Sequence, residues 1–132
     1  MSRVSTLMVR YAFAVLFLWF GTEQLLNPDM WVAFLPAWTG YLPVPSLMLI
    51  QFNGWFEIVF ALLLALGGFT RLVAAALSLH LLGIAVTAGG AIGMRDFALS
   101  IMGGALVFSR PDAWTLDALF AKKKTGQTPT SP

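Results

Sequence analysis

Cysteine is absent from this chain of 132 residues, and histidine occurs once. Without cysteine the chain has no thiol or disulfide chemistry of its own, and it cannot hold a cysteine-ligated cluster or zinc ion. A metal site would need carboxylates from several segments around the one histidine, so no metal site is expected. Charge is also scarce, because 11% of the residues are charged against roughly 25% in an ordinary soluble domain. Any thiol-based redox chemistry would have to come from a partner.

Apolar residues dominate instead, at 58% of the chain with a mean hydropathy of +0.80. A helix needs about 20 largely apolar residues to cross a bilayer, and four windows qualify, near residues 7–26, 47–66, 71–88 and 92–109. They lack the alternation of a lipid-facing barrel strand. The sequence therefore predicts an all-α integral membrane four-helix bundle, with a single transmembrane domain over 1–121 and a basic, then disordered, cytoplasmic tail over 122–132.

The basic residues indicate how the bundle is oriented. If four helices alternate in direction, seven of the eight lysines and arginines fall at one end. Short cytoplasmic loops carry such an excess, so both termini are expected in the cytoplasm of a multi-pass protein of the bacterial inner membrane. The lysine run is thus interpreted as an orientation signal, and no nucleic-acid partner is expected. These seven residues are Arg3, Arg10, Arg71, Arg110, Lys122, Lys123 and Lys124.

The opposite end is expected to carry an aromatic and proline-rich extracytoplasmic loop between the first two helices. The segment "NPDMWVAFLPAWTGYLPVP" contains Trp31, Phe34, Trp38 and Tyr41 and no basic residue. Aromatic rings with polar edges favour the headgroup level of the bilayer. An interfacial anchor is the favoured interpretation, and a lid over a ligand is the alternative.

Glu57 interrupts the second apolar window near its middle. It is about 16 Å along a helix that starts at Leu47, and a central acid costs around 2.5 to 3.5 kcal/mol even on lenient insertion scales. Such a residue should face the interior of the protein or a water-filled pocket. An acid at this depth favours a functional site over a structural tie.

Helical spacing predicts which faces are buried. In the second window Asn53, Glu57, Ala61 and Ala65 form one polar and small stripe, while Phe60, Leu64 and, on the third helix, Leu79 are expected to face lipid or a partner. The third and fourth windows repeat the pattern. Their expected inner residues are Ala76, His80, Gly83 and Thr87 on the third helix, and Asp96, Ser100, Gly103 and Gly104 on the fourth.

Polar side chains collect in the predicted outer half of the bundle, which favours a pocket that opens outward. For His80 a packing hydrogen bond is the favoured alternative to a ligand role. Arg95 and Asp96 could equally form an interfacial ion pair at a helix start. The candidate ligand-binding residues are Glu57, Asn53, His80, Arg95, Asp96, Glu23 and Gln24.

Four segments together resemble the DoxX family of small four-helix membrane proteins. "MVRYAFAVLFLWFGTEQLLNP" is similar to the family's opening, "FEIVFALLLALGGFTRL" to its central glutamate and Gly-x-x-Thr-Arg, "RDFALSIMGGALVF" to its fourth helix, and "SRPDAWTLDALF" to its closing segment. Gln24 stands where the family usually has lysine. The resemblance implies that any cation paired with Glu57 must here come from Arg95 or be absent. It marks Arg10, Glu57, Arg71, Arg95, Asp96 and Asp117 as family-pattern residues.

The resemblance also implies an association with membrane oxidoreductase assemblies, such as a thiosulfate:quinone oxidoreductase subunit. With no cofactor of its own expected, the chain is interpreted as a non-catalytic or co-catalytic subunit rather than an enzyme acting alone. It would bind a quinone-like ligand non-covalently, with protonated Glu57, His80 or Arg95 donating to a carbonyl. A proton relay or transport protein and a non-catalytic scaffold or assembly factor are the alternatives. A complete alternating-access carrier would have to be a homo-oligomer, because four short helices show no inverted repeat.

Overall fold

The computed structural model describes residues 1–110 and 112–126, and in these residues it contains helices and no strand. Four helices are long and apolar enough to cross a membrane, namely α1 (Arg3–Leu26), α2 (Ser46–Leu66), α3 (Thr70–Ala88) and α4 (Gly90–Phe108). The predicted all-α membrane fold with four spans is therefore confirmed. The first span begins earlier than predicted because Ser2 caps α1, its hydroxyl accepting the Ser5 N–H at 3.1 Å.

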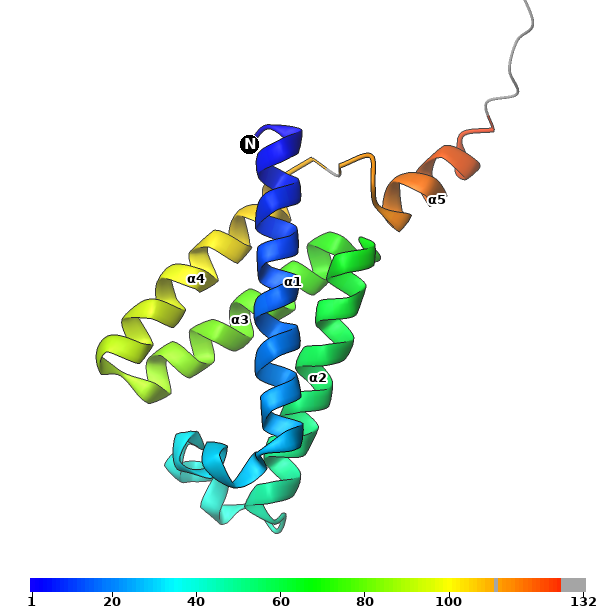
Figure 1. Ribbon diagram of the computed structural model, residues 1–132. Helices are drawn as coiled ribbons and strands as arrows, with labels where there is room; N and C mark the ends of the chain where they lie inside the picture. Colours follow the sequence, from blue (N-terminus) through cyan, green and yellow to red (C-terminus); the bar gives the residue numbers. More distant parts are fainter. Residues whose placement is uncertain (111, 127–132) are drawn as a thin grey trace, which may run out of the picture.

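The four helices are arranged as two hairpins, α1 with α2 and α3 with α4 (Figure 1). Glycines let α1 and α2 cross closely, since a Cβ placed on Gly21 would lie 2.7 Å from the carbonyl oxygen of Gly54. The turn between α3 and α4 uses Gly89 and Gly90, both at positive φ (62° and 55°), where glycine carries no steric cost. In Figure 1 the α3/α4 hairpin is inclined to α1 and α2, so the hairpins diverge away from the N-terminus.

The connection between α1 and α2 folds into two short 3-10 helices, η1 (Pro28–Phe34) and η2 (Ala37–Tyr41). Its aromatic residues partly turn back on α1, because the Trp31 ring lies edge-on to Phe20 with centroids 5.6 Å apart. Trp38 and Tyr41 are left uncovered by the protein. This segment joins the ends of α1 and α2 that lie farthest from the N-terminus (Figure 1).

The core differs from the sequence prediction on α2. Leu64 was expected to face lipid, but it is 0% exposed and belongs to the central apolar cluster. Steps of four residues drift by about 40° around a helix, whereas a step of seven returns to within about 20°. Leu64 therefore shares the buried face of Glu57, seven residues earlier, while Ala65 lies at its edge. Phe60, also expected outside, is half-buried against Phe56 and the core.

The predicted inner face of α3 is wrong in its second half. Gly83 and Thr87 are exposed, and the residues that α3 buries extend only as far as Leu81. Beyond Leu81 the helix diverges from α1 and α2 and loses their cover (Figure 1). Leu79 is exposed as expected, and on α4 the expected inner residues Asp96, Ser100 and Gly103 are buried.

A fifth, short helix, α5 (Leu116–Lys124), was missed by the sequence prediction. Thr115 caps it by accepting the Ala118 N–H on its hydroxyl at 3.0 Å. Lys122 to Lys124, the basic start of the predicted tail, form its last turn, where lysines favour the negative end of a helix dipole. The rest of the predicted disordered tail, from residue 127 onward, lies outside the described residues.

Candidate functional site

Glu57 is the centre of a buried hydrogen-bond network, which we call the Glu57 network, formed with Gln24, Asn53 and His80. Its carboxylate is 2% exposed. Oε2 accepts a hydrogen bond from Gln24 Nε2 at 2.9 Å, and Oε1 accepts one from Asn53 Nδ2 at 3.0 Å and lies 3.0 Å from His80 Nε2. Asn53 Nδ2 also donates to Gln24 Oε1 at 2.7 Å. Three helices thus supply the partners of one carboxylate.

The helices position these groups through spacing and small residues. Asn53 and Glu57 are four residues apart on α2, so their side chains are neighbours on one helical face. Gln24 approaches from α1 beside Gly54, where an added Cβ would lie 3.2 Å from the Gln24 Cβ. A larger residue at position 54 would therefore force Gln24 away from Glu57.

His80 is the member of the network that comes from the second hairpin. Its ring lies between aromatic neighbours, with the Phe56 centroid at 5.2 Å and the Phe17 centroid at 6.4 Å. Its side chain keeps 21% exposure while that of Glu57 keeps 3%. Glu57 is therefore enclosed, whereas His80 and Asn53 are both partly exposed.

The arrangement can hold a negative charge and pass a proton. The two amides can only donate to the carboxylate through their N–H groups, while an imidazole nitrogen is a donor or an acceptor depending on its tautomer and charge. Within the network, a proton can thus be transferred only at the contact between Glu57 and His80. Among the described residues, no three His, Asp or Glu side chains gather into a metal-binding group.

The remaining predicted site residues lie outside this network. Arg95 Nε donates to its neighbour Asp96 at 2.8 Å, with Asp96 buried and the Arg95 side chain 52% exposed. Glu23 is partly exposed and accepts from Asn27 Nδ2 at 3.3 Å. Of the two alternatives for Arg95, the ion pair with Asp96 is the one the structure shows, and the amide of Gln24 donates to Glu57.

A second polar cluster, which the sequence did not predict as such, lies at the other end of the bundle. Arg10 is 0% exposed, and its Nε and Nη2 donate to the two oxygens of Asp112 at 3.0 and 3.2 Å. Its guanidinium also donates to the carbonyl oxygens of Leu64, Ala65 and Trp114. Arg10 was noted as a family-pattern residue, but no periodicity could pair it with an aspartate 102 positions away.

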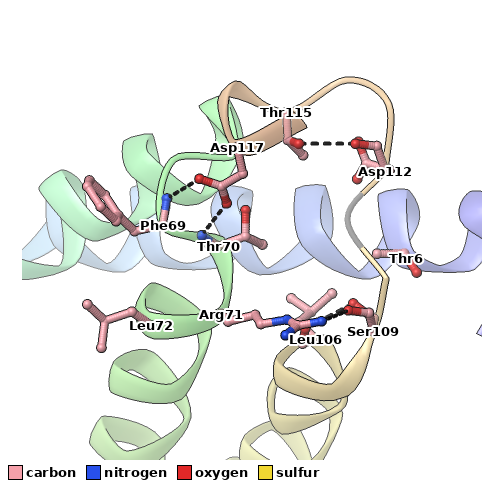
Figure 2. A pocket seen from close by; sticks show the side chains of 10 residues that line it. All are labelled: Thr6, Phe69, Thr70, Arg71, Leu72, Leu106, Ser109, Asp112, Thr115 and Asp117. Carbon is pink, nitrogen blue, oxygen red and sulfur yellow. Dashed lines mark hydrogen bonds between the residues drawn. The ribbon is translucent and has the colours of Figure 1, made fainter. Parts of the chain in front are cut away.

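Two pockets lie among the described residues 1–110 and 112–126 outside the Glu57 network, and neither is lined by its members. One of about 450 Å³ lies at the end of the bundle that holds the N-terminus, among the starts of α1, α3 and α5 and the end of α4 (Figure 2). The other, of about 400 Å³, lies beside the turn between α3 and α4. The larger pocket is lined by Thr6, Phe69, Thr70, Arg71, Leu72, Leu106, Ser109, Asp112, Thr115 and Asp117.

The four apolar spans and the buried carboxylate network define a small multi-pass membrane protein with a polar centre inside its helices. The chain belongs to the DoxX family, whose model, described as DoxX, matches residues 5–90. The match includes all four members of the Glu57 network and ends at the start of α4, before Arg95, Asp96 and Asp112. No curated protein and no solved structure matches this chain.

Proposed function

We propose that this DoxX-family protein is a subunit of a membrane oxidoreductase assembly and that it binds a quinone-like ligand against the exposed edge of His80. The observation that carries the proposal is the buried carboxylate of Glu57 in contact with the partly exposed imidazole of His80. A quinone carbonyl needs a hydrogen-bond donor in apolar surroundings. His80 offers a ring nitrogen beside Phe17 and Phe56.

The chemistry asked of this chain is limited to binding and proton exchange. Reduction of a quinone to a quinol takes two electrons and two protons, and the electrons would come from a redox-active partner subunit. The pair of His80 and Glu57 would hold a proton next to one quinone oxygen, because His80 Nε2 and Glu57 Oε1 lie 3.0 Å apart. A ligand that dissolves in lipid could reach His80 from the membrane without an enclosed cavity.

A second candidate function is that of a non-catalytic scaffold, and one observation favours it. Gln24, Asn53 and His80 satisfy both oxygens of Glu57, so the network is complete without a ligand. It also ties α1 and α2 to α3, across the boundary between the two hairpins. In this role the acid would stabilise helix packing, as polar contacts do inside membranes.

Thermal unfolding of the purified protein with and without a membrane quinone separates the two functions. A ligand at 100 times its dissociation constant stabilises the folded state by about 2.7 kcal/mol, so the parent should melt at a clearly higher temperature with quinone. His80→Phe keeps an aromatic ring and removes the nitrogen, and it should abolish this shift. Arg95→Gln is the matched control, because Arg95 pairs with Asp96 and should leave the shift unchanged.

The outcomes of this experiment distinguish a quinone contact at His80 from a scaffold role. An equal shift in the parent and in His80→Phe would exclude His80 as the contact. No shift in the parent would favour the scaffold. Copurification in mild detergent tests the oxidoreductase assembly separately, since the proposal requires a partner that carries a redox cofactor.

The proposed location is the bacterial inner membrane, with both termini and Arg71 in the cytoplasm. The chain has no native cysteine, so single cysteines at Ser2, Thr39 and Thr125 can each be labelled in intact cells with an impermeant thiol reagent. Thr39 in η2 should react, and the other two should react only after the membrane is opened. Labelling at Ser2 without labelling at Thr39 would show that the protein has the opposite orientation in the membrane.

A further inference from the structure

The pocket of about 450 Å³ contains a buried hydroxyl group that has no hydrogen-bond partner among the described residues. Four hydroxyl residues line it, and three of them donate to backbone carbonyl oxygens, Thr6 at 3.1 Å, Ser109 at 2.9 Å and Thr115 at 3.1 Å. The fourth, Thr70, is 7% exposed, and its Oγ1 has no hydrogen-bond partner in the described part of the chain. A buried polar group without a partner costs about 1 to 3 kcal/mol, so a ligand that bonds it would recover that loss.

The same pocket carries a positive charge. Arg71 lines the same pocket from the first turn of α3, and its one side-chain hydrogen bond to the described residues is a long one, from Nη2 to Ser109 O at 3.5 Å (Figure 2). Most of its N–H groups are therefore available to an acceptor from outside. Arginine presents these donors in a planar fork that matches phosphate oxygens.

The two aspartates of the pocket already have partners. Asp112 bonds Arg10, and the two oxygens of Asp117 accept the backbone N–H groups of Phe69 and Thr70, each at 2.8 Å (Figure 2). Asp117 thereby occupies the N-terminal end of α3. A new anion is thus expected to lie between Arg71 and the Thr70 hydroxyl, with the helix end left to Asp117.

The surroundings of the pocket fit a lipid. We call one end of the bundle the basic end, because it holds Arg3, Arg71, Arg110 and the α5 lysines. At this end α5 projects away from the four spans (Figure 1). Trp114, Leu119 and Phe120 are uncovered by the protein in or beside α5. Apolar residues next to a lysine run are typical of helices that lie among anionic headgroups.

We propose that this pocket binds the phosphate group of a membrane phospholipid from the adjoining leaflet. Arg71 and the Thr70 hydroxyl hold the phosphate, the exposed side chains of Phe69 and Leu72 contact the acyl chains, and α5 lies along the neighbouring headgroups. The ligand class is thus an anionic phosphodiester with an apolar tail. This site is independent of the Glu57 network, because the two share no residue.

Lipid retention by the purified full-length protein tests the proposal. Phosphatidylglycerol is titrated into the protein in mild detergent and bound lipid is counted by native mass spectrometry. Thr70→Val keeps the shape and removes the hydroxyl, while its backbone N–H still reaches Asp117. Loss of a hydrogen bond to a charged group should weaken retention about tenfold, and Arg71→Gln should weaken it at least as much.

Ser78→Ala is the matched control. Ser78 Oγ is the other buried hydroxyl without a partner in the described chain, but it lies at the contact of α3 with α4, away from the pocket. Its removal should leave retention unchanged. The control also separates lipid binding from folding, since both variants delete a hydroxyl that bonds nothing in the protein.

Two further ligands identify the source of the phosphate. A diacylglycerol with the same acyl chains should bind poorly, and equal retention of it would overturn the proposal by showing an apolar groove only. Inorganic phosphate that competes with the lipid would assign the same phosphate site to a free anion. Equal phosphatidylglycerol retention by the parent, Thr70→Val and Arg71→Gln would refute the site.

Discussion

Replacing Glu57 by leucine should destabilise the bundle, although membrane depth alone predicts the reverse. Leucine removes a costly acid from the hydrocarbon region, but it also removes three contacts of 2.9 to 3.0 Å. Hydrogen bonds inside membrane proteins average about 0.6 kcal/mol, or about 2 kcal/mol for three. Gln24 Nε2 loses its one described acceptor while the residue stays buried, and an orphaned group of this kind costs about 1 to 3 kcal/mol. Because these terms overlap, the expected loss is about 2 to 4 kcal/mol.

The measurement is the free energy of unfolding in mixed micelles, by titration with a denaturing detergent, for the parent and for three variants. Glu57→Gln keeps one acceptor oxygen, so it should lose less stability than Glu57→Leu. Glu23→Gln is the control, because this glutamate lies partly exposed and its one side-chain hydrogen bond is long, 3.3 Å. It should change stability by less than about 0.5 kcal/mol. If Glu57→Leu unfolds at the same point as the parent or later, the network does not stabilise the fold.

Three further variants test packing and charge elsewhere in the bundle. Asp112→Ala leaves Arg10 buried without its carboxylate and should cost about 3 to 5 kcal/mol; in the same unfolding titration, a loss below about 1 kcal/mol would mean that the three carbonyl bonds of Arg10 suffice. Gly103→Ala would bring a Cβ into collision with the Phe13 ring and should cost about 1 to 3 kcal/mol, whereas Gly104→Ala meets nothing within 4 Å and should be neutral. Equal stability of these two alanine variants would contradict the close approach of α4 to α1.

The sequence was sufficient for the spans because hydropathy is a local property. The windows predicted near 47–66 and 71–88 coincide with α2 and α3 to within one residue. The cost of a charge in lipid likewise predicted that Glu57 would be buried, whatever its partners. Both conclusions follow from the solvent that surrounds a segment, without knowledge of its neighbours.

The partners of Glu57 could not be predicted in the same way. Asn53 follows from a four-residue spacing, but Gln24 and His80 are 33 and 23 positions away. Their approach depends on how α1 and α3 are rotated about their own axes, which apolar residues on every face do not specify. The candidate list therefore combined the four members of the Glu57 network with Glu23, Arg95 and Asp96, which lie outside it.

The sequence by itself determined that the chain crosses a membrane in four helices and that Glu57 is buried among them. Tertiary structure decided which faces meet, because helices surrounded by lipid gain little from hiding one apolar face over another, and close packing selects the contact instead. It placed Leu64 inside, uncovered the second half of α3, and brought Arg10 to an aspartate 102 positions away. These contacts depend on how whole helices fit together, as Gly21 of α1 fits against Gly54 of α2. The sequence of one segment alone does not specify such a fit.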